Sequence, residues 1–231
     1  MSRRAASETV DAAEMRAKNS RLLLNLIWHE QRISQAELAR RTGLSRSTVS
    51  VIVRQLESNG LIQVIGTGTS TGGRRPVLLG FCDDAFLPLG VEIGSRHITA
   101  ALTDLRGNVR AIHSIEFGVR DDPEGALAAA KQLIDRCIAS EPISRILGLG
   151  IGVPSPVDPA QPGRLSPLLI PAWRDYDVHQ WFAERYPVPV FIDNDANLGA
   201  LAEHWWGDEN DDLTYIKIGT GIGAGHIIRG E

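Results

Sequence analysis

The sequence is poor in cysteine and lacks long apolar runs. Its 231 residues include two cysteines, Cys82 and Cys137, which lie far apart and match no metal-ligand spacing. No stretch approaches the ~18 apolar residues of a membrane-spanning helix, and the first residues lack the apolar centre of a signal peptide. We therefore expect two core thiols in a reducing compartment, no membrane partner, and a soluble cytoplasmic protein.

The charge is unevenly divided along the chain. Residues 1–80 carry 12 Lys and Arg against 6 Asp and Glu, whereas residues 81–231 carry 12 against 22. The balances are +6 and −10, which give the net charge of −4. A basic front part joined to an acidic rear part is typical of a nucleic-acid reader attached to a second function.

Residues 34–60 predict two short helices joined by a tight turn. Ser34 with Glu37 three residues later is a capping box that begins the first helix. Gly43 provides the sharp turn, and Ser45 caps the second helix. Asn59 with the following glycine ends that helix.

The second helix has one apolar face and one polar face. Its apolar residues Val49, Ile52, Val53 and Leu56 follow helical spacing. Short polar side chains and arginines on the other face suit the major groove of DNA. The predicted DNA contacts from this segment are Ser45, Arg46, Ser47, Thr48, Ser50 and Arg54. The alternative is an ordinary helical hairpin with a charged, solvated face.

The next segment favours the DNA-binding interpretation. Residues 61–65 predict a strand, residues 66–73 a tip rich in Gly, Thr and Ser, and residues 74–79 a returning strand. A strand, a tip and a strand after two helices make a winged helix-turn-helix. Arg74 and Arg75 then stand where a wing meets the sugar-phosphate backbone.

From residue 89 the pattern becomes α/β. Three β-rich runs are followed by alternating helices and strands, which predicts a mixed sheet with helices on both faces. Residues 214–230 repeat the strand, glycine-rich turn and strand of residues 89–104. We expect a flexible arm over 1–18, a winged helix-turn-helix over 19–80, a linker over 81–88, a first lobe over 89–212 and the start of an incomplete second lobe over 213–231.

Two features of the rear part carry possible chemistry. The turn containing Gly219, Thr220, Gly221 and Gly223 offers backbone N–H groups to an anion, although such hairpins also occur without a ligand. The Asp-Asn-Asp run at 193–195 follows a strand and precedes a helix, where open α/β sheets place ligands. There it suits sugar hydroxyls or a general base, or it merely caps the helix.

In order along the chain, these motifs resemble the ROK family of sugar kinases and sugar-responsive repressors. The residues that carry the resemblance are Arg-Arg-Pro at 74–76, GVEIG at 90–94, GIGVPSPVD at 150–158, IDNDANLGALAEHWWG at 192–207 and IGTGIGAG at 218–225. The resemblance implies an actin/hexokinase-like (ribonuclease H-like) fold. It also implies that Asn194 and Asp195 bind a sugar, with Asp195 the base in kinases, and that Ser155 and the segment around Trp173 border the sugar pocket.

Departures from the family pattern argue against kinase activity. Kinases of the family carry Asp-Ile-Gly-Gly-Thr for phosphate and magnesium, whereas this chain has Glu92, Ile93, Gly94, Ser95 and Arg96. We regard Gly94 and the 219–223 turn as remnants of a phosphate loop. We expect no cofactor within this chain, because the zinc site that the resemblance implies would lie beyond residue 231.

The sequence therefore predicts a sugar-responsive transcriptional regulator, with a double-stranded operator, a sugar or sugar phosphate effector and a homodimer or higher homo-oligomer. The alternative is an ATP-dependent sugar kinase with an accessory DNA-binding domain. A third hypothesis is that the chain is truncated within its second lobe, which would leave Ile216, Ile218, Ile227 and Ile228 uncovered.

Overall fold

The computed structural model of the chain describes residues 2–69, 75–158, 160–166, 169–207 and 211–230, without the side chains of residues 2–12 and 162. The chain divides into two compact units, Met1–Ala85 and Phe86–Glu231. The last strand of the first unit ends at Phe81 and the first strand of the second begins at Leu87.

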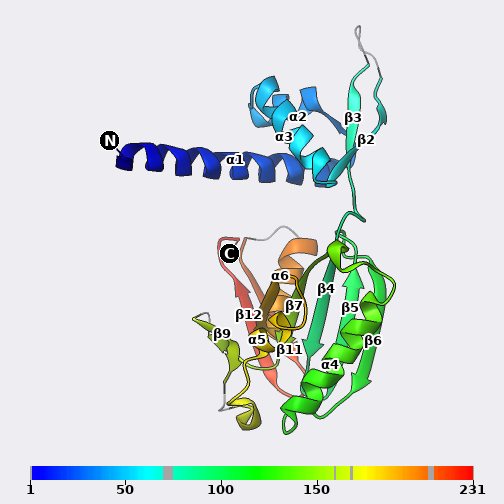
Figure 1. The fold of residues 1–231 in the computed structure, drawn as a ribbon, viewed down its shortest axis with the longest axis vertical. Coiled ribbons are helices and arrows are strands. Elements are labelled where there is room, and N and C mark those ends of the chain that lie inside the picture. The colour runs from blue at the N-terminus through cyan, green and yellow to red at the C-terminus, as the bar shows by residue number, and fades with distance from the viewer. Residues whose placement is uncertain (1, 70–74, 159, 167–168, 208–210, 231) are drawn as a thin grey trace. The chain divides into compact units, whose positions relative to one another are not determined.

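The first unit is built from three helices and a small antiparallel sheet (Figure 1). The strands follow the order β1-β3-β2, and β2 with β3 forms the expected wing hairpin. The elements are α1 (Ser2–Glu30), β1 (Ile33–Ser34), α2 (Gln35–Thr42), α3 (Arg46–Ser58), β2 (Ile62–Thr67) and β3 (Val77–Phe81).

Local sequence signals begin and end the two short helices. The Ser34 hydroxyl accepts a hydrogen bond from the Glu37 backbone N–H (3.2 Å). Gly43 ends α2 at φ 70°, a left-handed conformation that glycine adopts without strain. All four residues of the predicted apolar face of α3 are buried. The buried core of this unit consists of Leu23, Ile27, Ile33, Leu38, Val49, Ile52, Val53, Leu56, Ile62 and Leu79.

The structure differs from the sequence prediction at the start of this unit. We expected a flexible arm over residues 1–18, whereas the structure has a helix from residue 2 onward. Residues 2–18 belong to α1, which has 29 residues and continues into the winged helix-turn-helix. The segment is polar and poorly patterned, but it contains neither glycine nor proline and is rich in Ala, Arg and Glu. Those residues have high intrinsic helix propensity, so a helix can extend without an apolar face.

The second unit contains a five-stranded mixed sheet in the order β10-β7-β4-β5-β6. β10, β7 and β4 run parallel, and β5 and β6 continue antiparallel. The strands of this sheet are β4 (Leu87–Ile93), β5 (His97–Thr103), β6 (Val109–Glu116), β7 (Ile146–Val153) and β10 (Val190–Asn194). Because β7 and β10 are parallel neighbours, their carboxyl ends meet at one edge, where Val153 stands opposite Asn194.

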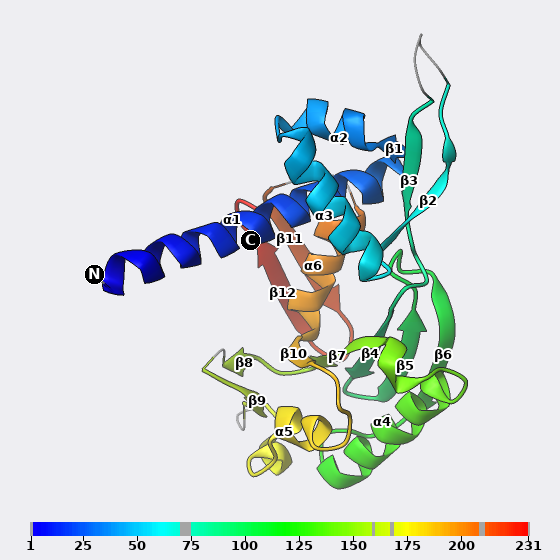
Figure 2. The ribbon, with the colours of Figure 1, turned by 45° about the horizontal axis from the view of Figure 1, so that its top comes forward.

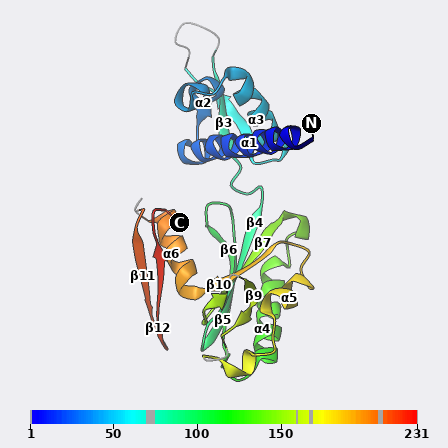
Figure 3. The ribbon, with the colours of Figure 1, turned by 90° about the vertical axis from the view of Figure 1, so that its left-hand side faces the viewer.

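Helices cover both faces of this sheet, as the sequence predicts. α4 (Pro123–Ile138) and α5 (Val178–Ala183) contribute to the core on one face. α6 (Asp195–Trp206) lies on the other, because Gly152 points away from that core and its missing Cβ would stand 3.4 Å from Leu198. Figure 3 shows α6 on the opposite side of the strands from α4.

Three smaller elements were not predicted from the sequence. They are the hairpin of β8 (Val157–Asp158) and β9 (Gln161–Leu165), which lies near α5 in Figure 2, and the 3-10 turns η1 (Ile143–Arg145) and η2 (Pro171–Trp173). Within the described residues, no helix is long and apolar enough to cross a membrane.

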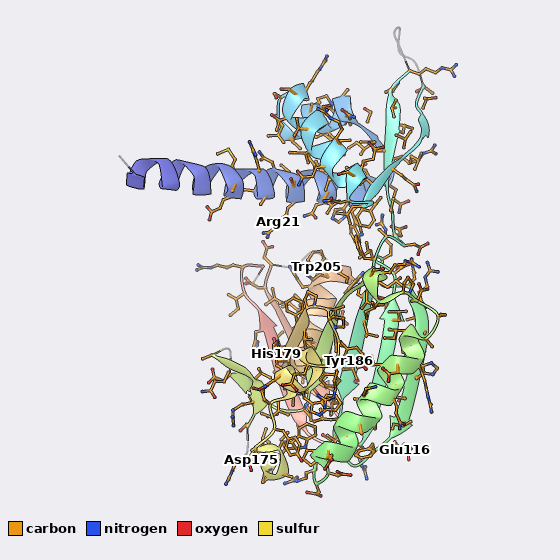
Figure 4. All side chains as sticks on the ribbon, in the orientation of Figure 1. Arg21, Glu116, Asp175, His179, Tyr186 and Trp205 are labelled. Carbon is orange, nitrogen blue, oxygen red and sulfur yellow. The ribbon has the colours of Figure 1, made fainter. Side chains whose placement is uncertain are left out.

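The C-terminal strands β11 (Leu213–Ile218) and β12 (Ile222–Ile227) pair as an antiparallel hairpin against α6. Their glycines make this packing possible. A Cβ on Gly225 would stand 2.2 Å from the Ala196 carbonyl oxygen, and one on Gly199 would stand 2.4 Å from the Tyr215 ring. Several side chains around this hairpin remain exposed, including Ile218 (78%) and Trp205 (60%), which Figure 4 labels on α6.

A tyrosine links the loop after α5 to α4. The Tyr186 hydroxyl, labelled in Figure 4, donates a hydrogen bond to Asp135 Oδ1 (2.9 Å). Burial and this acidic acceptor raise the pKa of Tyr186, so the phenol stays protonated at any ordinary pH.

Candidate functional site

The first candidate site is the N-terminal end of α3, where a cluster of hydroxyl groups holds the helix start. Ser45 Oγ accepts a hydrogen bond from the Thr48 backbone N–H (3.1 Å). The same oxygen lies 2.8 Å from both Ser47 Oγ and Thr48 Oγ1. The predicted DNA-contact residues Ser45, Ser47 and Thr48 therefore also cap the helix. Replacing one of them would change the shape of this helix end as well as any contact with DNA.

The outward row of α3, defined as Arg46, Ser47, Ser50, Val51 and Arg54, lies opposite its buried face. All of these side chains are exposed except Ser50, which is half-buried. Arg54 is directed back along the helix, since its Nε donates to the Ser50 carbonyl oxygen (3.2 Å). The predicted polar residues therefore share one accessible face, with a cation at each end of the row.

Val51 is the member of this row that the sequence reasoning missed. Its side chain is 57% exposed, and it is the one large apolar side chain exposed on α3, every residue of which the structure describes. The signal was readable, because Val51 stands four residues after Ser47 and three before Arg54. Only the polar side chains of this face were predicted to contact DNA.

The wing carries one described arginine. Arg75 is exposed two residues before β3 begins. Arg74, its predicted partner in backbone contact, lies outside the described residues. Most of β2 is also accessible, since all of its residues except Ile62 are exposed and Val64 is 53% exposed.

The second candidate site lies at the carboxyl ends of β7 and β10, where α6 begins. Asn194 caps α6, because its Oδ1 accepts from the Ala196 backbone N–H (2.9 Å) and its Nδ2 donates to the Val153 carbonyl oxygen (3.4 Å). The capping interpretation therefore holds for Asn194. Asp195 is the first residue of α6 and has a different partner.

Lys217 on β11 joins two carboxylates from different segments. Its Nζ donates to Asp195 Oδ2 (2.8 Å) and to Glu92 Oε1 (2.7 Å). The other Glu92 oxygen, Oε2, lies 3.3 Å from His97 Nε2. We call these four residues the carboxylate–lysine cluster. Their side chains are partly shielded from water, with Asp195 16%, Lys217 33% and Glu92 37% exposed.

The charges in this cluster stabilise one another. Burial alone would raise the pKa of Glu92, but the hydrogen bonds and charge of Lys217, with His97, lower it below its ordinary value. Burial alone would lower the pKa of Lys217, but Asp195 and Glu92 raise it. At neutral pH the cluster therefore holds an ammonium between two carboxylates.

Two of the predicted phosphate-loop glycines use their N–H groups within their own turns. The Gly94 N–H donates to the His97 carbonyl oxygen (2.9 Å), which closes the turn between β4 and β5. The Gly219 N–H donates to the Gly221 carbonyl oxygen (2.9 Å) within its own turn. Thr220 is exposed in that turn, and Gly223 packs against Ala196, so part of the glycine signal reflects packing.

Two residues predicted at or beside a sugar pocket are fully buried. The Ser155 hydroxyl accepts from the Ser166 backbone N–H (2.9 Å) and donates to the Pro156 carbonyl oxygen (3.3 Å). Trp173 donates from its ring nitrogen to the Val119 carbonyl oxygen (2.9 Å) inside the core. Both residues hold loops in this structure, and their contact with a sugar stays a prediction.

The carboxylate–lysine cluster presents both hydrogen-bond acceptors and donors. Among the described residues, no group of three His, Cys, Asp or Glu side chains is placed to hold a metal ion. Asp195 Oδ2 already accepts from an ammonium, so that oxygen is not ready to remove a proton from a hydroxyl. Carboxylate oxygens and an ammonium together offer acceptors and donors to a neutral polyol.

Comparison with protein-family models matches residues 88–231 to the ROK family and residues 16–63 to a winged helix-turn-helix DNA-binding domain. The sequence is also 36% identical over 225 residues to a xylose repressor from Bacillus subtilis (strain 168). That similarity covers 96% of this chain and 58% of the repressor's length.

Solved structures share the fold. One, a ROK family transcriptional regulator that is a homolog of the E. coli MLC protein, is 24% identical with a TM-score of 0.74, over 94% of this chain and 56% of its own. Another, a ROK family glucokinase from Streptomyces griseus in complex with glucose and AMPPNP, is 28% identical with a TM-score of 0.54, over 63% of this chain and 45% of its own.

Proposed function

This chain belongs to the ROK family, and we propose that it is a sugar-responsive transcriptional repressor of carbohydrate-metabolism genes. The outward row of α3 carries this proposal. Short hydroxyl side chains allow the helix to approach a duplex closely, and Arg46 and Arg54 reach bases or phosphates. The wing arginines Arg74 and Arg75 grip the backbone beside the groove.

In this proposal the second unit binds the effector near the carboxylate–lysine cluster. Asp195 and Asn194 receive hydroxyl groups of a sugar, and Ser155 borders the sugar pocket. The effector must bind two conformations of the protein with different affinities, because a ligand that binds both equally does not shift the equilibrium between them. The resemblance to a xylose repressor makes D-xylose the first effector to test.

A sugar kinase is the second candidate, and the position of Asp195 at the start of α6 favours it. Lys217 argues against it. A magnesium–nucleotide complex needs the carboxylates to face a divalent cation, whereas here an ammonium on the chain itself lies between Glu92 and Asp195. Glu92 and Arg96 also stand where kinases of the family carry Asp and Thr.

Enrichment of binding sites from a random duplex pool, followed by gel shifts with the purified chain, tests the repressor proposal. We expect half-sites about one helical turn apart, or a multiple of it, because a homodimer would read an inverted repeat. Arg46→Ala should weaken binding by roughly 5- to 100-fold, as expected for an arginine on a base edge.

Arg120→Ala is the matched control, since Arg120 is exposed in the second unit. No enriched sequence at low salt, or equal losses of DNA affinity for the two variants, would contradict the proposal.

An ATP-consumption assay over a pentose and hexose panel tests the kinase alternative. Turnover that Asp195→Asn abolishes would make the kinase the better description.

A further inference from the structure

Val51 is an apolar side chain in a row that is otherwise built for polar contact. The buried face of α3 is complete without it, because Val49, Ile52, Val53 and Leu56 fill the core. At 57% exposure, Val51 presents methyl groups to water from the same face as Ser47 and Arg54. It therefore does not serve the packing of the first unit.

The major groove of DNA offers one apolar group that such a side chain fits. Every base edge in this groove presents hydrogen-bond donors or acceptors, but thymine also carries a C5-methyl group, which apolar side chains contact. A valine side chain is short and has a restricted χ1 angle, so its methyl groups have a defined position relative to the helix.

We propose that Val51 reads the C5-methyl group of a thymine in each half-site, and so sets base preference at one position of the operator. This inference rests on the proposed DNA-binding function and adds the base that the outward row of α3 selects. Its short neighbours Ser47 and Ser50 leave room for close approach. Arg54 bonds to the Ser50 carbonyl oxygen, and Val51 remains 57% exposed.

The polar members of the row cannot make this distinction. A hydroxyl group bonds to several base edges, and an arginine on a phosphate contacts any sequence. A methyl–methyl contact is favourable only where the base carries the methyl group. The preference for thymine over uracil at one position therefore belongs to Val51.

Deoxyuridine scanning of an enriched site tests the inference, because deoxyuridine pairs like thymidine but lacks the C5-methyl group. Each thymidine of one half-site is replaced in turn, and the dissociation constants of the full chain and of Val51→Ala are measured by fluorescence anisotropy. For the unaltered chain, one replacement should weaken binding by about fourfold, the value for burying one methyl-sized group.

The Val51→Ala variant should bind the thymidine duplex at least about fourfold more weakly than the unaltered chain does. Its dissociation constant should not change when deoxyuridine replaces thymidine at that position. Such non-additivity identifies a direct contact. Val109→Ala is the control, because Val109 is equally exposed (57%) but lies on β6 of the second unit. It should respond to deoxyuridine as the unaltered chain does.

The outcomes separate the two proposals. If no duplex is enriched, the repressor proposal fails and the inference fails with it. If a site is enriched but no thymine is sensitive, or the deoxyuridine penalty is unchanged in Val51→Ala, only the inference is overturned. Far-UV circular dichroism confirms that the variant is folded; alanine is the better helix former, so α3 should be retained.

Discussion

The two units place their chemically important side chains in opposite ways. In the first unit the outward row of α3 faces water, and a separate apolar core supports the helix behind it. In the second unit Glu92, Asp195 and Lys217 face one another across three segments of the chain. A change on the first surface should alter binding and leave folding intact, whereas a change in the second cluster should alter both.

The largest expected effect comes from the core of the first unit. Leu38 on α2 is fully buried, so Leu38→Ala should destabilise this unit by about 2–5 kcal/mol through lost burial and the cavity left behind. Hydrogen exchange followed by mass spectrometry should show lost protection in α2 and α3 and unchanged protection in α4.

Leu22→Ala is the control for this prediction, since Leu22 on α1 is 42% exposed and should lose little. Equal loss of protection in α4 would break the comparison, because it would mean that the two units unfold as one.

Removal of the cation from the carboxylate–lysine cluster should have the next largest effect. Lys217→Met leaves Glu92 and Asp195 without their shared partner, and we expect a loss of about 1–2 kcal/mol, moderated because these side chains are partly in water. The thermal midpoint of the second unit should fall by about 2–6 °C. Near-UV circular dichroism follows this transition.

Lys131→Met is the matched control. Lys131 pairs with Asp135 on the surface of α4 (2.6 Å) with both side chains about half exposed, so its loss should be smaller than ~0.5 kcal/mol. Adding Glu92→Gln to Lys217→Met should recover part of the stability. Equal effects of the two lysine variants would show that the cluster behaves as an ordinary surface pair.

The smallest expected effect is on the pH dependence of stability. The pKa of Glu92 is lower in the folded chain than its ordinary value of 4.5, so the unfolded chain binds the proton more readily. The contribution of Glu92 is therefore present above about pH 4.5 and is lost as the pH falls through the folded pKa. Because Glu92 is 37% exposed, this amounts to a fraction of a kcal/mol.

Lys217 behaves in the opposite sense. Its folded pKa is raised above the ordinary 10.5, so its contribution to stability is complete below that pH and is lost as the pH rises through the folded value.

Urea unfolding between pH 3 and 6 measures the contribution of Glu92. The free energy of unfolding should fall less steeply with decreasing pH for Glu92→Gln than for the unaltered chain. Identical declines would remove Glu92 from this balance.

Local signals in the sequence predicted the first unit well. The Ser34 and Ser45 caps, the Gly43 turn and the apolar spacing of α3 depend on residues within one or two turns of each other, and all are present. Val51 was equally readable from its place in the helix. The extension of α1 to Ser2 was not predicted, because residues 2–18 lack a periodic apolar pattern and only their helix propensity indicates a helix.

The carboxylate–lysine cluster could not be predicted in the same way. The sequence shows Glu92 as a departure from a phosphate motif and Lys217 as one residue of a strand, 125 positions away. Their contact depends on the packing of β11 and β12 against α6, which in turn requires the close approach of Gly225 to Ala196. No local pattern records that distance.

By itself, the sequence determined the order of the main helices and strands, the polar residues on the outward face of α3 and the family to which the chain belongs, because short-range spacing and turn chemistry encode these features. Only the tertiary structure decided that Lys217 neutralises Asp195 and Glu92. The physical reason is that charges interact through distance in space, and that distance is set only when the distant parts of the chain pack together.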